Sequence, residues 1–127
     1  MNSKTASIII GLAFLGVGAL GFVSNPLIGH HAIFHADTTH NMVHIVSGSL
    51  FILIALAMPP NAGMFCKIFG VVYLLLGVGG LLQFGMAGMG ELLGFLHVNG
   101  ADNLLHIALG LIIFLAGTLR SKTSRYA

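Results

Sequence analysis

The residues of this chain best suited to chemistry are histidines and one aspartate that interrupt strongly apolar segments. His44 and His106 each stand in the pattern Asn-x-x-His-x-x-x-Gly. Neutral imidazole is the commonest metal ligand in proteins, and ionisable groups inside apolar spans usually face the interior of a bundle. The two copies of the pattern therefore predict one polar site. Its candidate cofactor-binding residues are His44, His106, Asn41, Asn103, Gly48 and Gly110.

Further candidate ligands precede each copy. His40 lies one helical turn before His44, and Asp102 lies one turn before His106. A carboxylate at that spacing can accept a hydrogen bond from an imidazole and orient it as a ligand. A second matched pair of histidines lies just upstream of both copies. The candidate metal ligands are therefore His44, His106, His40, Asp102, His35 and His97.

Three interpretations of these residues are open. The first is a site for a transition metal (copper, zinc or iron) or for b-type haem, where Gly48 and Gly110 would let a flat macrocycle approach the backbone. The second is a polar clasp, in which His, Asn and Asp side chains hydrogen-bond across the bundle and fix the helix register. The third is a proton- or ion-handling site. No Cys-x-x-Cys-His is present, which excludes covalent c-type haem, and no catalytic residue is assigned.

The polar pattern belongs to a longer internal repeat. The segment from His35 to Gly48 recurs 62 residues later, and the string LGVGAL at 15–20 resembles LGVGGL at 76–81. We interpret this as a tandem duplication, with repeats at about 5–60 and 65–120 in one membrane domain. Two such halves have the same topology, so we expect a symmetry axis along the membrane normal. That axis would bring His44 and His106 towards each other.

Composition places these repeats in a membrane. Of 127 residues, 57% are hydrophobic and only 6% are charged, whereas soluble domains carry about 25% charged residues. Four apolar runs are long enough to cross the bilayer as helices, approximately 5–24, 38–58, 65–85 and 100–119. We expect an all-α protein, a bundle of four transmembrane helices. Its partners would be the lipid bilayer and other membrane proteins or further copies of itself, because the small positive charge gives no support for nucleic-acid binding.

Capping residues and charges refine this arrangement. Asp37 or Thr38 can cap the second run, and Asn99 with Asp102 has the form of a capping box before the fourth. All the cations would lie on one side of the membrane if the runs alternate in direction. The positive-inside rule then predicts a multi-pass membrane protein with both termini cytoplasmic and connections 25–37 and 86–99 outside. The cations are Lys4, Lys67, Arg120, Lys122 and Arg125.

The pattern Ala-Asp-Asn-x-x-His-x-x-x-Gly in the fourth run, and its shorter form in the second, resemble an uncharacterised family of bacterial four-helix membrane proteins grouped as a domain of unknown function. The resemblance covers roughly residues 5–119. It implies a small bacterial inner-membrane protein and no particular activity. His30, His31 and His40 match no pattern of that family. The leading hypothesis is a metal- or haem-binding membrane protein, and the alternatives are an accessory or scaffold subunit held by the clasp, or a proton- or ion-handling protein.

Overall fold

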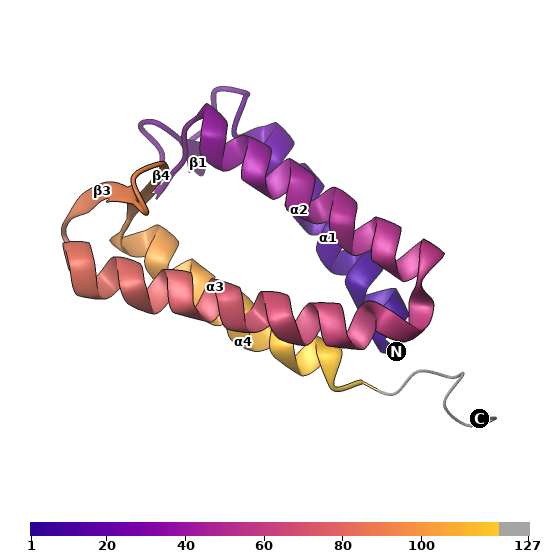
Figure 1. Ribbon diagram of the computed structural model, residues 1–127. Coiled ribbons are helices and arrows are strands. Elements are labelled where there is room, and N and C mark those ends of the chain that lie inside the picture. The colour runs from indigo at the N-terminus through magenta and orange to yellow at the C-terminus, as the bar shows by residue number, and fades with distance from the viewer. Residues whose placement is uncertain (120–127) are drawn as a thin grey trace.

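The structure, a computed structural model, describes residues 1–119 and contains four long helices. Each is long and apolar enough to cross a membrane, so the predicted all-α multi-pass bundle is confirmed. The cations at 120, 122 and 125 lie outside the described residues. The helices are α1 (Ser3–Leu20), α2 (Thr38–Ala57), α3 (Ala62–Phe84), which a short 3-10 turn η1 (Pro59–Asn61) precedes, and α4 (Gly100–Gly117) (Figure 1).

Local capping explains where the helices begin and end. The side chain of Asp37 accepts a hydrogen bond from the backbone N–H of His40, and Asn99 and Asp102 form the predicted capping box. Two of the predicted boundaries differ from the structure by three residues or more. The first helix ends at Leu20 rather than residue 24, because the Asn25 amide donates to the Leu20 carbonyl and folds the chain back. The third helix begins at 62 rather than 65, directly after the turn at η1.

Short strands cover the end of the bundle opposite the N-terminus, which we call the strand end (Figure 1). Strand β1 (Ile28–Gly29) pairs in parallel with β2 (Phe34–His35), and β3 (Met89–Leu92) pairs in antiparallel with β4 (Leu96–Asn99). Sequence analysis did not predict these strands. The Asn99 side-chain amide donates to the Ile33 carbonyl at 3.0 Å and joins the two connections. The strand layer therefore closes one end of the bundle.

The helices form two antiparallel hairpins, α1 with α2 and α3 with α4, whose backbones touch at glycines. A Cβ atom added to Gly48 would lie 2.6 Å from the Gly11 carbonyl oxygen, and one added to Gly70 would lie 2.7 Å from that of Gly110. Helix association in lipid depends on van der Waals packing, which small residues permit by letting backbones approach. These glycines set the spacing within each hairpin.

The two hairpins make corresponding glycine contacts. Each contacting glycine of α1 has its counterpart 59 residues later in α3. In α1, Gly11 and Gly18 contact α2 at Gly48 and Asn41; in α3, Gly70 and Gly77 contact α4 at Gly110 and Asn103. The LGVGAL alignment used a spacing of 61, which pairs Gly16 with Gly77 and Gly18 with Gly79. Gly16 and Gly79 face open space, whereas Gly77 and Gly18 contact the partner helix, so this alignment is wrong as a structural register. The duplication itself stays a prediction.

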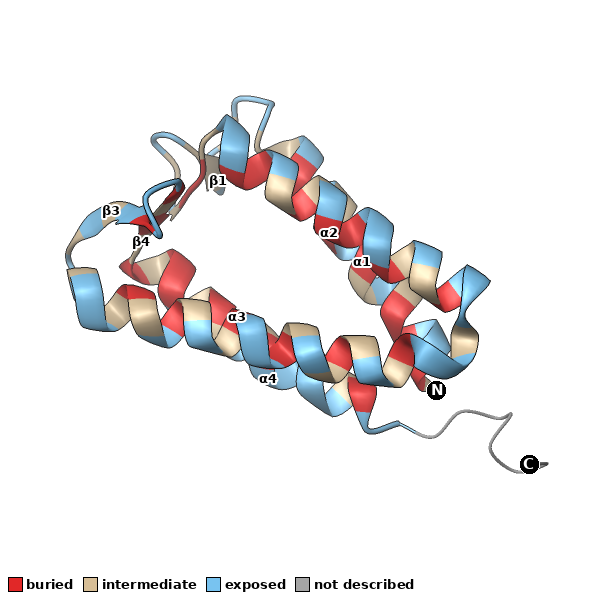
Figure 2. Ribbon diagram, viewed as in Figure 1, coloured by how far each residue is buried: buried red, intermediate tan, exposed pale blue. Residues whose placement is uncertain are grey.

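An aromatic core joins the hairpins at mid-height. Figure 2 shows buried residues where helices face one another and exposed residues on the outer surface. Many of the exposed residues are large and hydrophobic. The core consists of Phe14, Phe51, Cys66, Tyr73 and Ile113, with Phe65 and Phe69 packed against it.

A second connection between the hairpins lies near the N-terminus. The Ser3 hydroxyl lies 2.7 Å from the Leu119 carbonyl oxygen and 2.9 Å from that of Ala116, so it ties α1 to the end of α4.

We predict that Gly70→Ala destabilises the protein by about 1–3 kcal/mol, because the new methyl group would overlap the backbone of α4. The matched control is Gly79→Ala on the same helix, where nothing lies within 4 Å. It should leave stability unchanged or raise it by up to about 1 kcal/mol through helix propensity. Denaturant unfolding in detergent micelles, followed by circular dichroism, measures both, and equal effects would contradict the backbone contact.

Candidate metal centre

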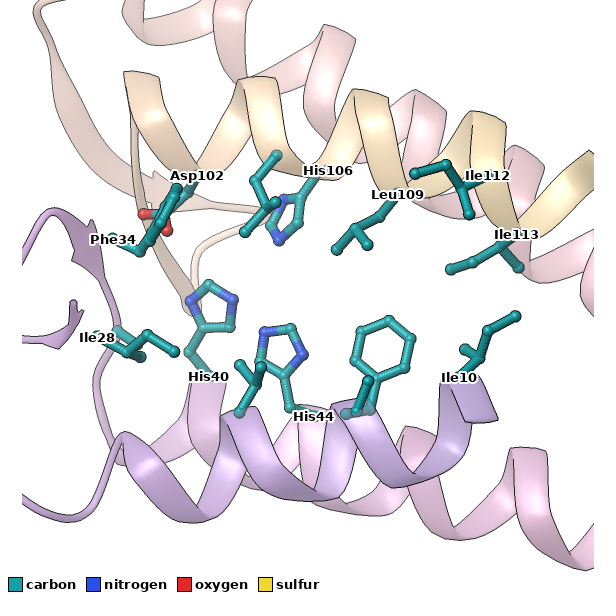
Figure 3. Close-up of a pocket in the computed structure, with 15 residues that line it drawn as sticks. Ile10, Ile28, Phe34, His40, His44, Asp102, His106, Leu109, Ile112 and Ile113 are labelled. Carbon is teal, nitrogen blue, oxygen red and sulfur yellow. The ribbon is translucent and has the colours of Figure 1, made fainter. Parts of the chain in front are cut away.

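Three histidines from the two hairpins meet between α2 and α4. His40, His44 and His106 are buried, and one potential ligand atom of each lies within 4.8 Å of those of the other two. The ring centroids of His44 and His106 are 6.4 Å apart, so the structure brings the predicted pair together. Figure 3 shows the two imidazoles of α2 facing that of α4 across the gap. We call these three residues the histidine cluster.

Helical geometry explains why α2 directs His40 and His44 into the cluster. Each residue turns about 100° around a helix, so positions four apart differ by about 40° and positions seven apart by about 20°. His40 and His44 thus share one stripe, which faces the other hairpin. Asn41 and Gly48 share the neighbouring stripe, which packs on Gly11 of α1 and on Gly21, the residue that caps its C-terminal end.

The same division holds on α4. Asp102 and His106 face the other hairpin, whereas Asn103 and Gly110 pack against α3. The predicted cofactor-binding set is therefore split: its histidines meet, and its asparagines and glycines lie inside the hairpins. A Cβ atom on Gly110 would come within 2.6 Å of the Leu74 backbone nitrogen, so this glycine does not border an open space.

A backbone hydrogen bond fixes the ring of His40. Its Nδ1 lies 2.9 Å from the carbonyl oxygen of His97 on β4. A carbonyl oxygen only accepts, so Nδ1 carries the proton and Nε2 keeps its lone pair. Histidines that bind metals commonly donate a hydrogen bond from the N–H of the ring nitrogen that does not bind the metal, which sets both the tautomer and the orientation of the ring. The strand end thus positions one member of the histidine cluster.

The other two cluster members lack such a bond. Within residues 1–119, the Nδ1 atoms of His44 and His106 are buried and have no hydrogen-bond partner, and neither do Oδ1 of Asn41 and both amide atoms of Asn103. The interhelical hydrogen bonds that a polar clasp requires are not formed by these atoms in the described part of the chain. Unpartnered nitrogen atoms at this depth are costly unless a ligand engages them.

Two aromatic side chains that sequence analysis missed flank the cluster. Phe14 stacks on His44 with centroids 5.3 Å apart and planes 20° apart, and Tyr73 meets His106 edge-on at 5.4 Å. In the 59-residue register these two aromatics are equivalent, within the shared string Gly-x-x-Phe/Tyr-x-x-x-Gly-x-x-Gly. Aligning the first and third spans on that string would have found them.

The remaining predicted ligands lie around the cluster rather than in it. Asp102 is buried, and one carboxylate oxygen accepts the backbone N–H of Asn99. His35 and His97 form a separate pair in the strand layer, with ring centroids 4.2 Å apart. His97 reaches the cluster only through its carbonyl group.

Burial lowers the pKa of His35, which lies outside the membrane-spanning helices. Removal from water disfavours the charged imidazolium, and the neighbouring His97 adds repulsion, so the pKa of His35 lies below its usual value of 6.5. His35 is therefore neutral at pH 7, with a proton on the Nδ1 that lies 3.0 Å from the His30 carbonyl oxygen.

A cavity of about 180 Å³ adjoins the cluster between the hairpins. The imidazoles and the Asp102 carboxyl group lie at one end of it, and aliphatic and aromatic side chains form the rest (Figure 3). A ligand held here would contact both polar and apolar groups. Its apolar walls include Ile10, Phe14, Leu105, Leu109 and Ile113.

These features define a multi-pass α-helical membrane protein with a buried cluster of three histidines. The chain belongs to the family described as Domain of unknown function (DUF4383), whose profile matches residues 4–119. Neither the curated proteins nor the solved structures compared with the chain gave a match. The family assignment agrees with the resemblance carried by the two Asn-x-x-His-x-x-x-Gly patterns.

We predict that His35 makes the protein less stable in acid. Because its folded pKa lies below 6.5, the unfolded state binds the proton more readily, and stability is lost as pH falls below about 6.5 through the folded pKa. Unfolding free energies at pH 8 and pH 5 should show a smaller loss for His35→Gln than for wild type. The two proteins are identical at every other position, so an equal loss would rule out this contribution of His35.

Proposed function

We propose that this protein binds one transition-metal ion, Zn²⁺ by preference, through His40, His44 and His106. The observation that carries the proposal is the convergence of these three buried imidazoles, whose potential ligand atoms lie within 4.8 Å of one another. They come from both hairpins, so a bound ion would join the two halves of the bundle. Imidazole suits Zn²⁺, Cu²⁺ and Fe²⁺, and three histidines with one open position form a common zinc arrangement.

The three imidazoles need to move only a short distance to bind one ion. A Zn–N bond of about 2.0–2.1 Å places tetrahedral ligand atoms about 3.3 Å apart. From separations of up to 4.8 Å, each imidazole would move inward by about 1 Å, within the range of side-chain adjustment. The His40 ring, already held by the His97 carbonyl group, presents Nε2 without a change of tautomer.

Features of the site support an ion over two of the other interpretations, the polar clasp and haem. A polar clasp would pair the buried polar atoms, yet Nδ1 of His44 and of His106 is unpartnered among the described residues. For haem, the cavity of about 180 Å³ is below the roughly 300–1,000 Å³ of ligand pockets, and Gly48 and Gly110 contact helix backbones. The proton- or ion-handling alternative uses the same histidines, so the metal-binding and liposome-flux experiments described below distinguish it from metal binding.

We further propose that the protein lies in the bacterial inner membrane with its N-terminus in the cytoplasm and its strand end outside. Lys4 and Lys67 lie near the helix ends away from the strands, whereas Asp37 and Glu91 lie at the strand end. The positive-inside rule supports this orientation. The histidine cluster, within two turns of the start of α2 and α4, would then lie in the outer half of the membrane.

We predict that His44→Ala and His106→Ala each weaken Zn²⁺ binding by more than about 100-fold, because each removes one of three ligands. The matched control is His31→Ala, which removes an exposed histidine of the β1–β2 connection and should leave affinity unchanged. Competition with a zinc-sensitive dye, on protein purified without a histidine tag, measures the affinity.

Two outcomes of this experiment would overturn the proposal. Wild-type protein that binds no stoichiometric Zn²⁺, Cu²⁺ or Fe²⁺ would exclude the site. Binding lost equally with His31→Ala would place the metal at the surface. A clasp instead predicts that His44→Ala unfolds the metal-free protein, and a proton pathway predicts pH-driven flux in liposomes that both cluster variants abolish.

We also predict that a chelator lowers the thermal stability of the wild-type protein. An ion that binds only the folded state stabilises it by about 2.7 kcal/mol at a free concentration of 100 Kd. Adding EDTA should therefore lower Tm, and returning Zn²⁺ should restore it. His106→Ala should show neither change. A wild-type Tm that is unaffected by chelator and by added Zn²⁺ would contradict a metal that bridges the hairpins.

A further inference from the structure

The cavity beside the histidine cluster has a polar end and an apolar end. His40, His44, His106 and Asp102 form the polar end, and no other ionisable side chain lines it within residues 1–119. Side chains of α1 and α4 form the apolar end. A molecule that matches this cavity therefore has an apolar body and a single polar group.

The cavity reaches the lipid-facing surface between α1 and α4. Ala13 of α1 and Ile112 of α4 both line it, yet Ala13 is exposed and Ile112 is 57% exposed. Both belong to membrane-spanning helices, so the surface beside them faces acyl chains. A molecule dissolved in the bilayer can thus approach the cavity sideways, without crossing the strand layer.

The size of the cavity limits its occupant. A cavity of about 150 Å³ lined by Leu, Ile and Phe stays dry and binds benzene. The cavity here, about 180 Å³, has similar apolar walls and so suits one aromatic ring or a short alkyl group. Part of that volume lies at the polar end, where it accommodates one oxygen atom near the imidazoles.

We propose that this cavity binds a small hydrophobic molecule from the bilayer, with a single ring or short alkyl body and one hydroxyl or carbonyl oxygen directed at the histidine cluster. The oxygen occupies the fourth coordination position of the metal ion, so the inference rests on the proposed function. Ile10 and Leu109 contact the body of the molecule, and Asp102 lies beside its polar end.

The experiment uses 4-fluorophenol as the probe and the full-length protein in lipid nanodiscs, loaded with Zn²⁺ or Co²⁺. Fluorine NMR should show saturable binding beyond the partitioning seen in empty nanodiscs. Co²⁺ is paramagnetic, so it should broaden the bound signal strongly, whereas Zn²⁺ should not. The Co²⁺ absorption band should also change when the phenol oxygen joins the metal.

Matched double variants test the location. Ala13→Phe with Leu109→Phe fills the cavity from both walls and should weaken probe binding at least tenfold. Ala19→Phe with Leu111→Phe makes the same changes at exposed positions of the same helices that do not line the cavity, and should bind as wild type does. Retention of the Co²⁺ band reports that each variant is folded. If the cavity-filling pair fails to fold, Ala13→Phe alone is compared with Ala19→Phe alone.

The outcomes separate this inference from the proposed function. A Co²⁺ band in wild type, with no saturable probe binding or no difference between the two variant pairs, overturns the cavity inference and leaves metal binding intact. No Co²⁺ band in wild type overturns the proposed function, whatever the probe does. Saturable binding without paramagnetic broadening places the probe away from the metal and also overturns the inference.

Discussion

The close approach of helix backbones within each hairpin is the constraint on which the structure depends. Lipid offers no hydrophobic gain for bringing two apolar helices together, so van der Waals contact must hold them. Gly11 on Gly48 and Gly70 on Gly110 provide it by removing side chains from one stripe of each helix. Contacts within the hairpin then occupy the whole of that stripe. The neighbouring stripe of α2 and α4 turns towards the other hairpin and carries the histidines into the space between them.

Much of the architecture could be predicted because it depends on local or bulk properties. Hydropathy and length determine the four spans, and the side chain of Asp37 and the Asn99–Asp102 capping box act over a few residues. The meeting of His44 and His106 followed from one pattern at matched depths in two spans. Bilayer energetics direct such groups inward, whatever the details of packing.

The division of the polar pattern could not be predicted, because a single helix does not reveal its neighbours. Asn41 and His44 differ by about 60° around α2, and both are compatible with one broad inner face. The contacts of Asn41 with Gly18 of α1 and with its C-cap residue Gly21 show that the asparagine faces α1. The role of Phe14 was hidden for a related reason, since the LGVGAL string suggested a register two residues away from the one that the glycine contacts use.

The hydrogen bond from His40 to the His97 carbonyl group has a mechanical consequence. His44 and His106 are carried by helices whose positions the glycine contacts set, but the ring of His40 is held by a strand. That strand, β4, runs directly into α4, whose first turn the Asn99–Asp102 capping box fixes. A single strand therefore couples the orientation of the His40 ring on α2 to the start of the helix that carries His106.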